Sequence, residues 1–388
     1  MTIWNIFIYT DLVLFIWVLL TVIYLTVFAI TSLFARHSQT PKAKSENRFI
    51  IIIPTKKNGI SVEATVRSIL GQTYSQRLFD VTVVGNNEDE ITLFHLAQQP
   101  ITLLTPNYSD NIWAKSLQVA INNLPQFKIY DSAIILEAGD IVEPEFLQQM
   151  NDAYESAGTK VIQAHKLALN RDTTSARLEA IFEEINNSIF RRGHISIGLS
   201  ASMASSGMVF NFDWFKSHIL SAKSSWVDKD LEAMIMREHI YVDYFDDIFI
   251  YSEKARKAEE FNHKRVSWFI SQWKTFFHNI HYLPTALFNR HYDLIDKFLQ
   301  WMLIPRILMM AIIVAMSVIT PFVYMTLALK WWGTFTLVLF AFAIATPNYL
   351  VDEKWNSTFF KIPAVLFSSV LKKFKIGQKL LDIVNLKK

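Results

Sequence analysis

The sequence predicts an α/β domain with a mostly parallel sheet, placed between apolar segments long enough to cross a membrane. Three observations favour this fold class. From residue 48 onward, short apolar strands alternate with amphipathic helical segments, as in βαβ units. Long uncharged runs stand near both ends of the chain. Hydrophobic residues make up 51% and aromatic residues 14% of the 388 residues, more than a soluble protein usually carries.

The first apolar run covers residues 12–34. Its 23 residues carry no charge, which is enough for a helix that crosses a hydrocarbon core of roughly 30 Å. A secretory signal would have basic residues before a shorter apolar core, whereas Asp11 precedes this run. We therefore expect a retained transmembrane anchor over residues 1–35.

Two further apolar runs, at 307–329 and 331–351, predict a transmembrane hairpin within residues 301–352. Lys330, Trp331 and Trp332 are typical of a membrane interface, so we expect the turn of the hairpin at 329–331.

The last part of the sequence, residues 353–388, is basic and predicts an amphipathic cytoplasmic tail. Within it, the apolar segment 362–371 is too short to span and is flanked by lysines, as in helices that lie on a membrane surface.

Basic residues follow the first and the last predicted span. They are Arg36, His37, Lys42, Lys44, Arg48, Lys354, Lys361, Lys372, Lys373, Lys375 and Lys379. The positive-inside rule places both groups in the cytoplasm, so we expect an outward N-terminus and a cytoplasmic central region. A bacterial inner-membrane protein fits this pattern. The absence of cysteine excludes disulfides, and a net charge of +3 is too small to indicate a nucleic-acid partner.

The candidate chemistry lies in three turns that follow predicted strands, at 54–59, 85–90 and 137–140. In the last of them, IILEAGDIVEPEFL, an apolar strand runs into an acidic turn and then a helix start that contains a proline. Glu137 and Asp140 offer the oxygen ligands that Mg²⁺ or Mn²⁺ prefers. The alternative is a solvated turn whose following acids favour the N-terminus of a helix.

The order of these segments resembles the membrane-embedded family-2 glycosyltransferases, which include cellulose, chitin and hyaluronan synthases and bacterial exopolysaccharide enzymes. The resemblance runs from about residue 48 to the last predicted span. It implies a GT-A domain, which is Rossmann-like and binds nucleotide-sugars, over 48–260 and amphipathic membrane-interface helices over 261–300. It also implies an inverting hexosyl transfer from a nucleotide-sugar, such as a UDP-sugar, to a polysaccharide or lipid-linked glycan in cell-surface polysaccharide synthesis.

The resemblance assigns donor-binding roles at three places. Pro54 and Thr55 would border the uracil, although Lys-Asn-Gly at 57–59 replaces the usual acids. Asn86 takes the place of the family's first acid. Lys115 resembles the lysine that supports the diphosphate.

The acidic turn matches the family pattern F-D-A-D-N-V-V-D-P-D-F-L position by position. Glu137 replaces the first Asp, Gly139 replaces the second, and Asp140 supplies an acid one residue later. The resemblance therefore implies a Mg²⁺ or Mn²⁺ site at Asp140 and Glu137, with Glu137 also near the donor.

The motif WVDKDLE implies a catalytic base. Against E-D-R-x-L the base is Asp228, which we prefer, and against T-E-D-L-E it is Asp230. An inverting transfer needs one carboxylate to take the proton of the acceptor hydroxyl. A helix-capping role is the alternative for Asp228.

The family motif Q-x-x-R-W lies over KRVSW at 264–268, where Lys replaces Gln and Ser replaces Arg. Lys264 and Arg265 would neutralise donor phosphate charge, and Trp268 would border the acceptor. Ser206 and Gly207, in the small-residue segment that matches the acceptor loop, would also do so. The alternative for 261–277 is a plain helix on the membrane surface.

Three family motifs thus depart from their usual residues together. The rival hypothesis is a catalytically impaired, transferase-like subunit that scaffolds or regulates an active partner. Three spans are few for a polymer channel, so either a partner subunit or a homo-oligomer completes the path beside membrane lipids, or the enzyme adds a single sugar.

Overall fold

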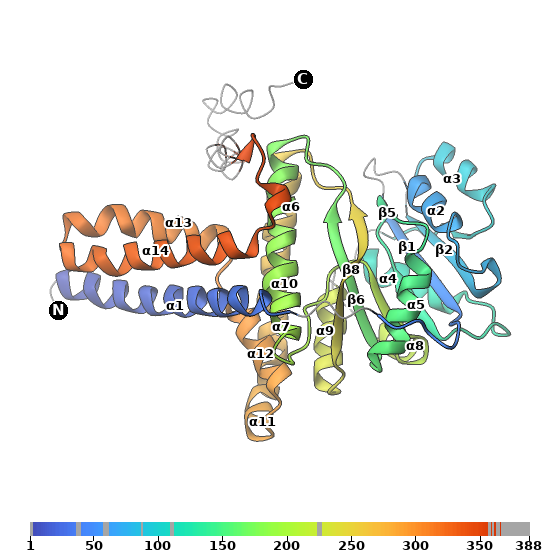
Figure 1. The fold of residues 1–388 in the computed structure, drawn as a ribbon, viewed down its shortest axis with the longest axis horizontal. Helices are drawn as coiled ribbons and strands as arrows, with labels where there is room; N and C mark the ends of the chain where they lie inside the picture. Colours follow the sequence, from blue (N-terminus) through green and yellow to red (C-terminus); the bar gives the residue numbers. More distant parts are fainter. Residues whose placement is uncertain are drawn as a thin grey trace.

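The computed structural model describes residues 3–35, 40–56, 62–86, 88–108, 112–222, 227–355, 358, 361 and 365. The turn at 57–59 and nearly all of the predicted tail helix at 362–371 lie outside them. Figure 1 shows an α/β domain at one end of the molecule and three long helices projecting from the other, with a group of crossing helices between them.

One eight-stranded sheet forms the α/β domain, in the order β3-β2-β1-β4-β7-β6-β8-β5. The strands are β1 (Phe49–Lys56), β2 (Phe79–Asn86), β3 (Thr102–Leu104), β4 (Ser132–Ile135), β5 (Asp140–Val142), β6 (Val161–Ala168), β7 (Met208–Asn211) and β8 (Val242–Ser252). The half β3-β2-β1-β4 is parallel, as the sequence predicts.

The other half is mixed, although β6 runs in the same direction as β4 and is parallel to β8, so the prediction of a mostly parallel sheet holds for every strand except β5 and β7. β7 is antiparallel to both β4 and β6, and β5 is antiparallel to β8. The chain that leaves β6 builds helices beyond the carboxyl end of that strand instead of crossing a face of the sheet. It then re-enters from the same end as β7, so β7 must run in the opposite direction.

Helices cover both faces of the sheet. They are α2 (Val62–Leu70), α3 (Glu90–Ala97), α4 (Ile112–Asn122), α5 (Phe146–Ala157), α8 (Phe212–Ile219) and α9 (Val227–Arg237). In β1, Ile50 and Ile52 pack into the core that includes α4 and α8, whereas Ile51 and Ile53 pack into the core that includes α2 and α5. Successive side chains of a strand point to opposite faces, so burial of both faces explains the unbroken apolar run.

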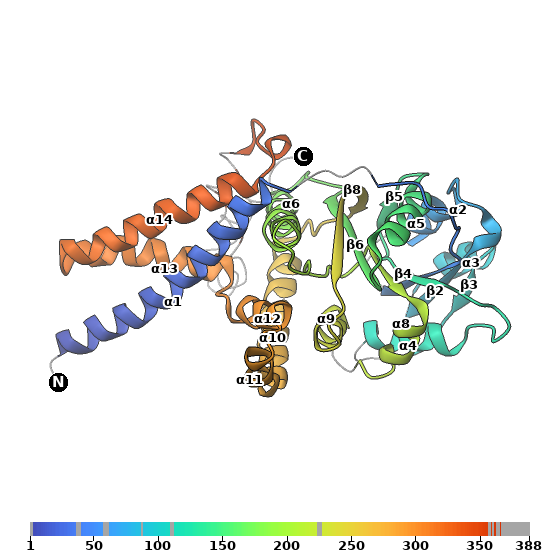
Figure 2. The ribbon, with the colours of Figure 1, turned by 60° about the horizontal axis from the view of Figure 1, so that its bottom comes forward.

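Two helices are long and apolar enough to cross a membrane, α1 (Ile3–Ser32) and α14 (Met325–Ala345). A third span is available if α12 (Tyr292–Met302) and α13 (Arg306–Ile319) act as one unit, which is bent by 55° between them. In Figures 1 and 2, α1, α13 and α14 lie along one another and point away from the sheet.

The hairpin turn lies at 320–324, before the predicted position at 329–331. α13 ends at Ile319, a short 3₁₀ segment holds Pro321, and α14 runs unbroken through 329–331. Proline lacks the N–H that would continue a helix, which explains the break there. The charge of Lys330 is balanced within the helix bundle, because Lys330 forms an ion pair with Asp11. The indole Nε1 of Trp331 donates a hydrogen bond to Asp11 Oδ1 at 2.8 Å. Asp11 itself lies inside α1 and is 2% exposed.

The helices between the sheet and the projecting spans run across the direction of those spans (Figure 1). They are α6 (Thr174–Asn186), the π-helix η2 (Asn187–Arg192), α7 (Gly193–Ile195), α10 (Ala258–Asn279), α11 (Leu283–Phe288) and α12. Short 3₁₀ turns are η1 (Gln76–Leu78), η3 (Ile280–Tyr282), η4 (Thr320–Phe322) and η5 (Asn348–Leu350). α1 packs directly against η2 and α7.

This contact between α1 and α7 has no room for a methyl group. A Cβ added at Gly193 would lie 2.3 Å from the backbone oxygen of Phe28, whereas one added at the helical Gly333 would meet nothing within 4 Å. We expect Gly193→Ala to reduce the free energy of unfolding by about 1–3 kcal/mol because it forces the two helices apart.

The matched control, Gly333→Ala, should be neutral or stabilising by about 1 kcal/mol, since alanine favours helix over glycine. Thermal unfolding of both variants in detergent checks this expectation. A Gly193→Ala protein as stable as the wild type would show that α1 is not packed against α7 in this way.

Candidate functional site

The three turns predicted to carry the chemistry meet at one edge of the sheet. Thr55 of β1 pairs in register with Gly85 of β2, one residue before Asn86. Glu137 follows β4, which lies on the other side of β1. The carboxyl ends of these parallel strands thus adjoin each other, as expected for the ligand-binding edge of an α/β sheet.

Gly139 shapes the acidic turn. Its φ of 96° is a backbone angle that residues other than glycine rarely adopt. The chain therefore folds back, and Asp140 Oδ2 accepts a hydrogen bond from the backbone N–H of Glu137 at 2.8 Å. Asp140 begins β5 opposite Ser252 of β8, whose hydroxyl donates to Asp140 Oδ1. Both oxygens of this carboxylate, which is 1% exposed, are thus engaged inside the protein.

Lys166 of β6 is the direct partner of Glu137. Its ammonium lies 2.6 Å from Glu137 Oε2 and 3.0 Å from the hydroxyl of Ser205. Burial alone would raise the pKa of Glu137, but the charge of Lys166 lowers it overall. Burial raises the pKa of Asp140, and the negative charge of Glu137 adds to this rise.

A divalent metal ion does not fit the acidic turn as it is arranged. Glu137 faces the Lys166 ammonium, and both oxygens of Asp140 accept protein hydrogen bonds. Among the residues that the structure describes, no group of three or more His, Cys, Asp and Glu side chains is placed to hold a metal. A metal between the two carboxylates would have to displace a buried ammonium, which is costly.

Asp228 lies in the first turn of α9. Its pKa is raised to about 6 by burial, and the negative charges of Glu232 and Glu137 add to the rise while Lys229 opposes it. Lys264 on α10 acts on Glu137, since its charge helps to lower the pKa of that carboxyl group. The fold therefore brings Asp228 and Lys264 within electrostatic reach of the acidic turn. Asp230 lies two residues farther along α9.

Glu232, one turn after Asp228, connects α9 to neighbouring segments. It is fully buried and accepts hydrogen bonds from Lys229 at 3.0 Å, Lys297 of α12 at 3.0 Å and the backbone N–H of Met203 at 3.0 Å. Despite burial, the two lysine charges hold the pKa of Glu232 far below its usual range. This carboxylate joins α9, the segment before β7 and α12.

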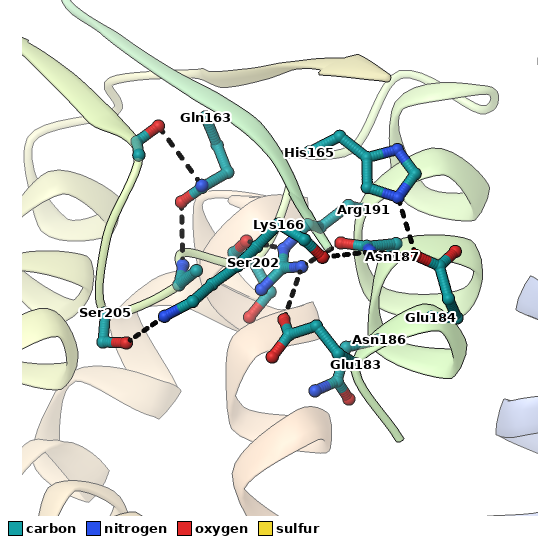
Figure 3. Close-up of polar contacts among 12 residues, drawn as sticks. Gln163, His165, Lys166, Glu183, Glu184, Asn186, Asn187, Arg191, Ser202 and Ser205 are labelled. Carbon is teal, nitrogen blue, oxygen red and sulfur yellow. Dashed lines mark hydrogen bonds and ion pairs between the residues drawn. The ribbon is translucent and has the colours of Figure 1, made fainter. Parts of the chain in front are cut away.

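A second charged cluster lies behind Lys166 (Figure 3). Glu183 of α6 forms ion pairs with Arg191 at 3.2 Å and with Lys254 at 3.3 Å. Burial would raise the pKa of Glu183, but the charges of Lys254 and Arg191 lower it well below its usual range. Arg191 belongs to the π-helix η2, a local geometry that is frequent at functional sites.

The predicted donor residues at the ends of β1 and β2 form contacts within the protein. Asn86 is 1% exposed, and its amide nitrogen donates to the backbone oxygen of Tyr108 at 2.9 Å, so it fixes the segment after β3. Thr55, which follows the buried Pro54, donates its hydroxyl proton to Glu88. Lys115 places its ammonium 5.8 Å from the ring centre of Tyr108. Glu88 is therefore the acid at this strand end.

Ser206 and Gly207, the predicted acceptor residues, lie inside the sheet. Ser206 is fully buried, and the backbone N–H of Gly207 donates to Ile135 at 2.9 Å. A Cβ on Gly207, whose φ is 76°, would lie 2.3 Å from Ile250 Cδ1. Their neighbour Ser205 is the residue of this segment that contacts Lys166.

The KRVSW segment lies on α10. Arg265 stacks on two aromatic rings, with its guanidinium carbon 4.6 Å from the centre of Phe182 and 5.2 Å from that of Phe261. Burial lowers the pKa of Arg265. Trp268 is half-buried, one turn farther along the helix. Phe261 is fully buried, so this end of α10 packs into the protein interior.

Several charged residues of the site were missed by sequence reasoning. They are Lys166, Glu183, Glu232, Lys254 and Lys297. One signal was present, because VIQAHKLA places a lysine in a strand flanked by apolar residues, where an unpaired charge would be costly. The partners of the other residues come from distant parts of the chain and leave no local pattern.

No family model matches this sequence, and no curated protein matches it either. Among solved structures, the chain is similar to a mannosyltransferase of Pyrobaculum calidifontis, PcManGT, in complex with GDP-Man and Mn²⁺, with 12% identity, 84% of this chain and 97% of that chain covered and a TM-score of 0.47. It is also similar to TarS 1–349 of S. aureus, with 12% identity, 86% and 90% covered and a TM-score of 0.44.

A third similar structure is TarS 1–349 in complex with UDP, at 12% identity and a TM-score of 0.38. This alignment covers 58% of this chain and 65% of that one. The function proposed below therefore rests on the residues of this chain.

The raised pKa of Asp228 predicts a pH-dependent effect on stability. The unfolded carboxyl ionises near pH 3.8 and the folded one near 6, so stability falls as the pH rises between these values and the loss is complete above them. Asp228→Asn removes this loss. Its free energy of unfolding should exceed that of the wild type by up to about 3 kcal/mol at neutral pH and match it near pH 4.

Asp172→Asn is a control of opposite sign. A hydrogen bond from Arg256 lowers the pKa of Asp172, so this variant should be the less stable one at neutral pH. Denaturant unfolding across the pH range measures both effects. An Asp228→Asn protein that loses stability at neutral pH would contradict the assignment.

Lys297 offers a test of the Glu232 anchor. Lys297→Met removes one partner of a fully buried carboxylate and should reduce the free energy of unfolding by about 3–5 kcal/mol. Lys274→Met, at an exposed lysine of α10, should stay within about 0.5 kcal/mol of the wild type. Equal effects of the two substitutions would show that the Glu232 contact does not stabilise the fold.

Proposed function

We propose that this protein is a membrane glycosyltransferase of the family-2 type, with a GT-A domain. It transfers a sugar, with inversion, from a nucleotide-sugar to a polysaccharide or lipid-linked glycan. A UDP-sugar is the proposed donor, and cell-surface polysaccharide synthesis is the proposed setting. One observation carries the proposal. A carboxylate with a pKa near 6, Asp228, lies within electrostatic reach of an acidic turn and several cations at the ligand-binding edge of an α/β sheet.

Asp228 suits the part of a general base. With a pKa of about 6 it is ionised at neutral pH, yet it is more basic than an ordinary aspartate. It would take the proton of the acceptor hydroxyl while the hydroxyl oxygen bonds to the anomeric carbon. The bond from that carbon to the donor phosphate would break, and its electron pair would leave with the diphosphate.

The donor would lie across the ends of β1, β2 and β4. Pro54, Thr55 and Asn86, with Glu88 added, would border the nucleoside, and Lys115 would approach the diphosphate from α4. Lys264 and Arg265 of α10 would stand on the other side, beside Glu137. Trp268 would border the acceptor, near the segment that contains Ser206 and Gly207.

The membrane would hold α1 and the hairpin of α13 and α14. The proposed division is an anchor over 1–35, a cytoplasmic domain over 48–260, interface helices over 261–300, a hairpin over 301–352 and a tail over 353–388. Phe269, Trp273 and Phe277 line an open groove on α10, which suits contact with membrane lipids. A bacterial inner membrane is the proposed location, and a partner subunit or second copy would complete any polymer path.

Mg²⁺ or Mn²⁺ is the cofactor that the resemblance implies for such a transfer. In this chain Glu137 and Asp140 would hold it only after Lys166 and Ser252 had moved away from them. No step above depends on the ion.

The second candidate function is a transferase-like subunit without turnover. The observation that favours it is the acidic turn itself, where Glu137 is paired with Lys166 and Asp140 is buried. Such a subunit would scaffold or regulate an active glycosyltransferase.

Calorimetry with the detergent-solubilised full chain separates the two candidates when it is combined with a transfer assay. The wild type should bind UDP and release it from a UDP-sugar, at a rate that rises as Asp228 ionises near pH 6. Asp228→Asn should keep UDP affinity within a factor of about three and lose transfer by a factor of about 10²–10⁴.

Asp230→Asn, two residues away on the same helix, is the matched control and should retain more activity. The reverse ranking would make Asp230 the base. UDP binding without transfer by any UDP-sugar would favour the subunit hypothesis, and failure to bind any nucleotide would overturn the transferase proposal.

A further inference from the structure

Lys166 occupies the position at which a divalent ion would have to bind. It reaches from β6 to the end of β4, where its ammonium lies 2.6 Å from Glu137 Oε2 and where the charge of Asp140 also acts on it. Its other contact is the hydroxyl of Ser205 at 3.0 Å (Figure 3). Within the described part of the chain, these two contacts use two of the three ammonium protons.

The surroundings hold this ammonium in place. Lys166 is only 5% exposed, and its backbone oxygen accepts a hydrogen bond from Asn187 of η2 at 3.0 Å. Behind it, Glu183 is already matched by Arg191 and Lys254. Glu183 is therefore not a free carboxylate that could draw Lys166 away from Glu137.

The acidic turn itself also disfavours a divalent ion. At the third position of the turn, Gly139 provides no ligand, and its positive φ allows Asp140 to bond inward to the backbone of Glu137 and to Ser252. The turn thus presents Glu137 as a carboxylate that Lys166 already neutralises. Both features weaken a metal site, because the oxygens that would bind the ion are already engaged.

We propose that Lys166, together with Lys264, supplies the positive charge that the donor diphosphate needs, so that nucleotide binding does not depend on a divalent ion. The inference rests on the proposed function. Lys166 neutralises Glu137 and offers its remaining proton to a phosphate oxygen. Lys264, whose side chain is 43% exposed, forms an ion pair with Glu260 at 3.3 Å on α10, and its charge also acts on Glu137.

The same charges serve the leaving group. As the bond between the anomeric carbon and the phosphate breaks, its electron pair stays on the diphosphate, and the fixed ammonium of Lys166 offsets the added negative charge. Lys166 keeps its proton throughout, because the proton of the acceptor hydroxyl goes to Asp228. No metal or other reactant enters this balance.

The test is UDP binding to the detergent-solubilised full chain by calorimetry, in excess EDTA and in excess Mn²⁺. We expect wild-type affinities that agree within a factor of about three. In EDTA, Lys166→Met should weaken binding by a factor of about ten or more, since it removes a charge-assisted hydrogen bond. Mn²⁺ should restore part of the affinity of this variant, because Glu137 is then free to bind metal.

Lys264→Met is the second variant, at a lysine whose side chain is 43% exposed, and should also weaken binding in EDTA. Wild-type binding that requires Mn²⁺ would overturn the inference and leave the proposed transferase in place. Equal affinity of the wild type and both variants in EDTA would overturn it as well. Absence of UDP binding under every condition would overturn the proposed function and the inference together.

Discussion

The fully buried carboxylate of Glu232 is the constraint on which the site depends. An ionised carboxylate away from water is costly unless several donors meet it. Glu232 meets donors from α9 itself, from the segment before β7 and from α12. If these parts moved apart, the buried carboxylate of Glu232 would lose hydrogen-bond donors. α9, which carries Asp228, is thus held against both the sheet and the helices that lead to the membrane.

The same network continues from Lys297 toward the first long helix. Lys297 donates to Gln300 at 3.1 Å, and Gln300 donates to Asp296 at 2.7 Å. Tyr24 of α1 donates to the other oxygen of Asp296 at 2.6 Å, and His194 stacks on Phe28 of α1, with ring centres 3.7 Å apart. A continuous chain of polar contacts therefore connects Glu232, on the helix that carries the candidate base, to α1. The orientation of the α/β domain relative to α1 is thus coupled to the position of α9.

Much of the fold could be predicted from local pattern. The alternation of strands and helices indicated the α/β domain, and uncharged runs indicated α1 and the apolar hairpin. The direction of β7 could not be predicted, because it depends on where the chain re-enters the sheet. The hairpin turn was misplaced because Lys330 resembled a charge at an interface, and its partner Asp11 lies 319 residues away.

The site follows the same division between local and distant causes. The strand ends and the WVDKDLE helix were found from sequence, because each is a local motif. What their residues contact was not, since Lys166 meets Glu137 across 29 positions and Lys297 meets Glu232 across 65. A family pattern records residue types at positions, whereas a buried charge is balanced by whichever cation the fold brings to it. A lysine on a distant strand can thus balance the charge of an acidic turn, although no local motif records the pair.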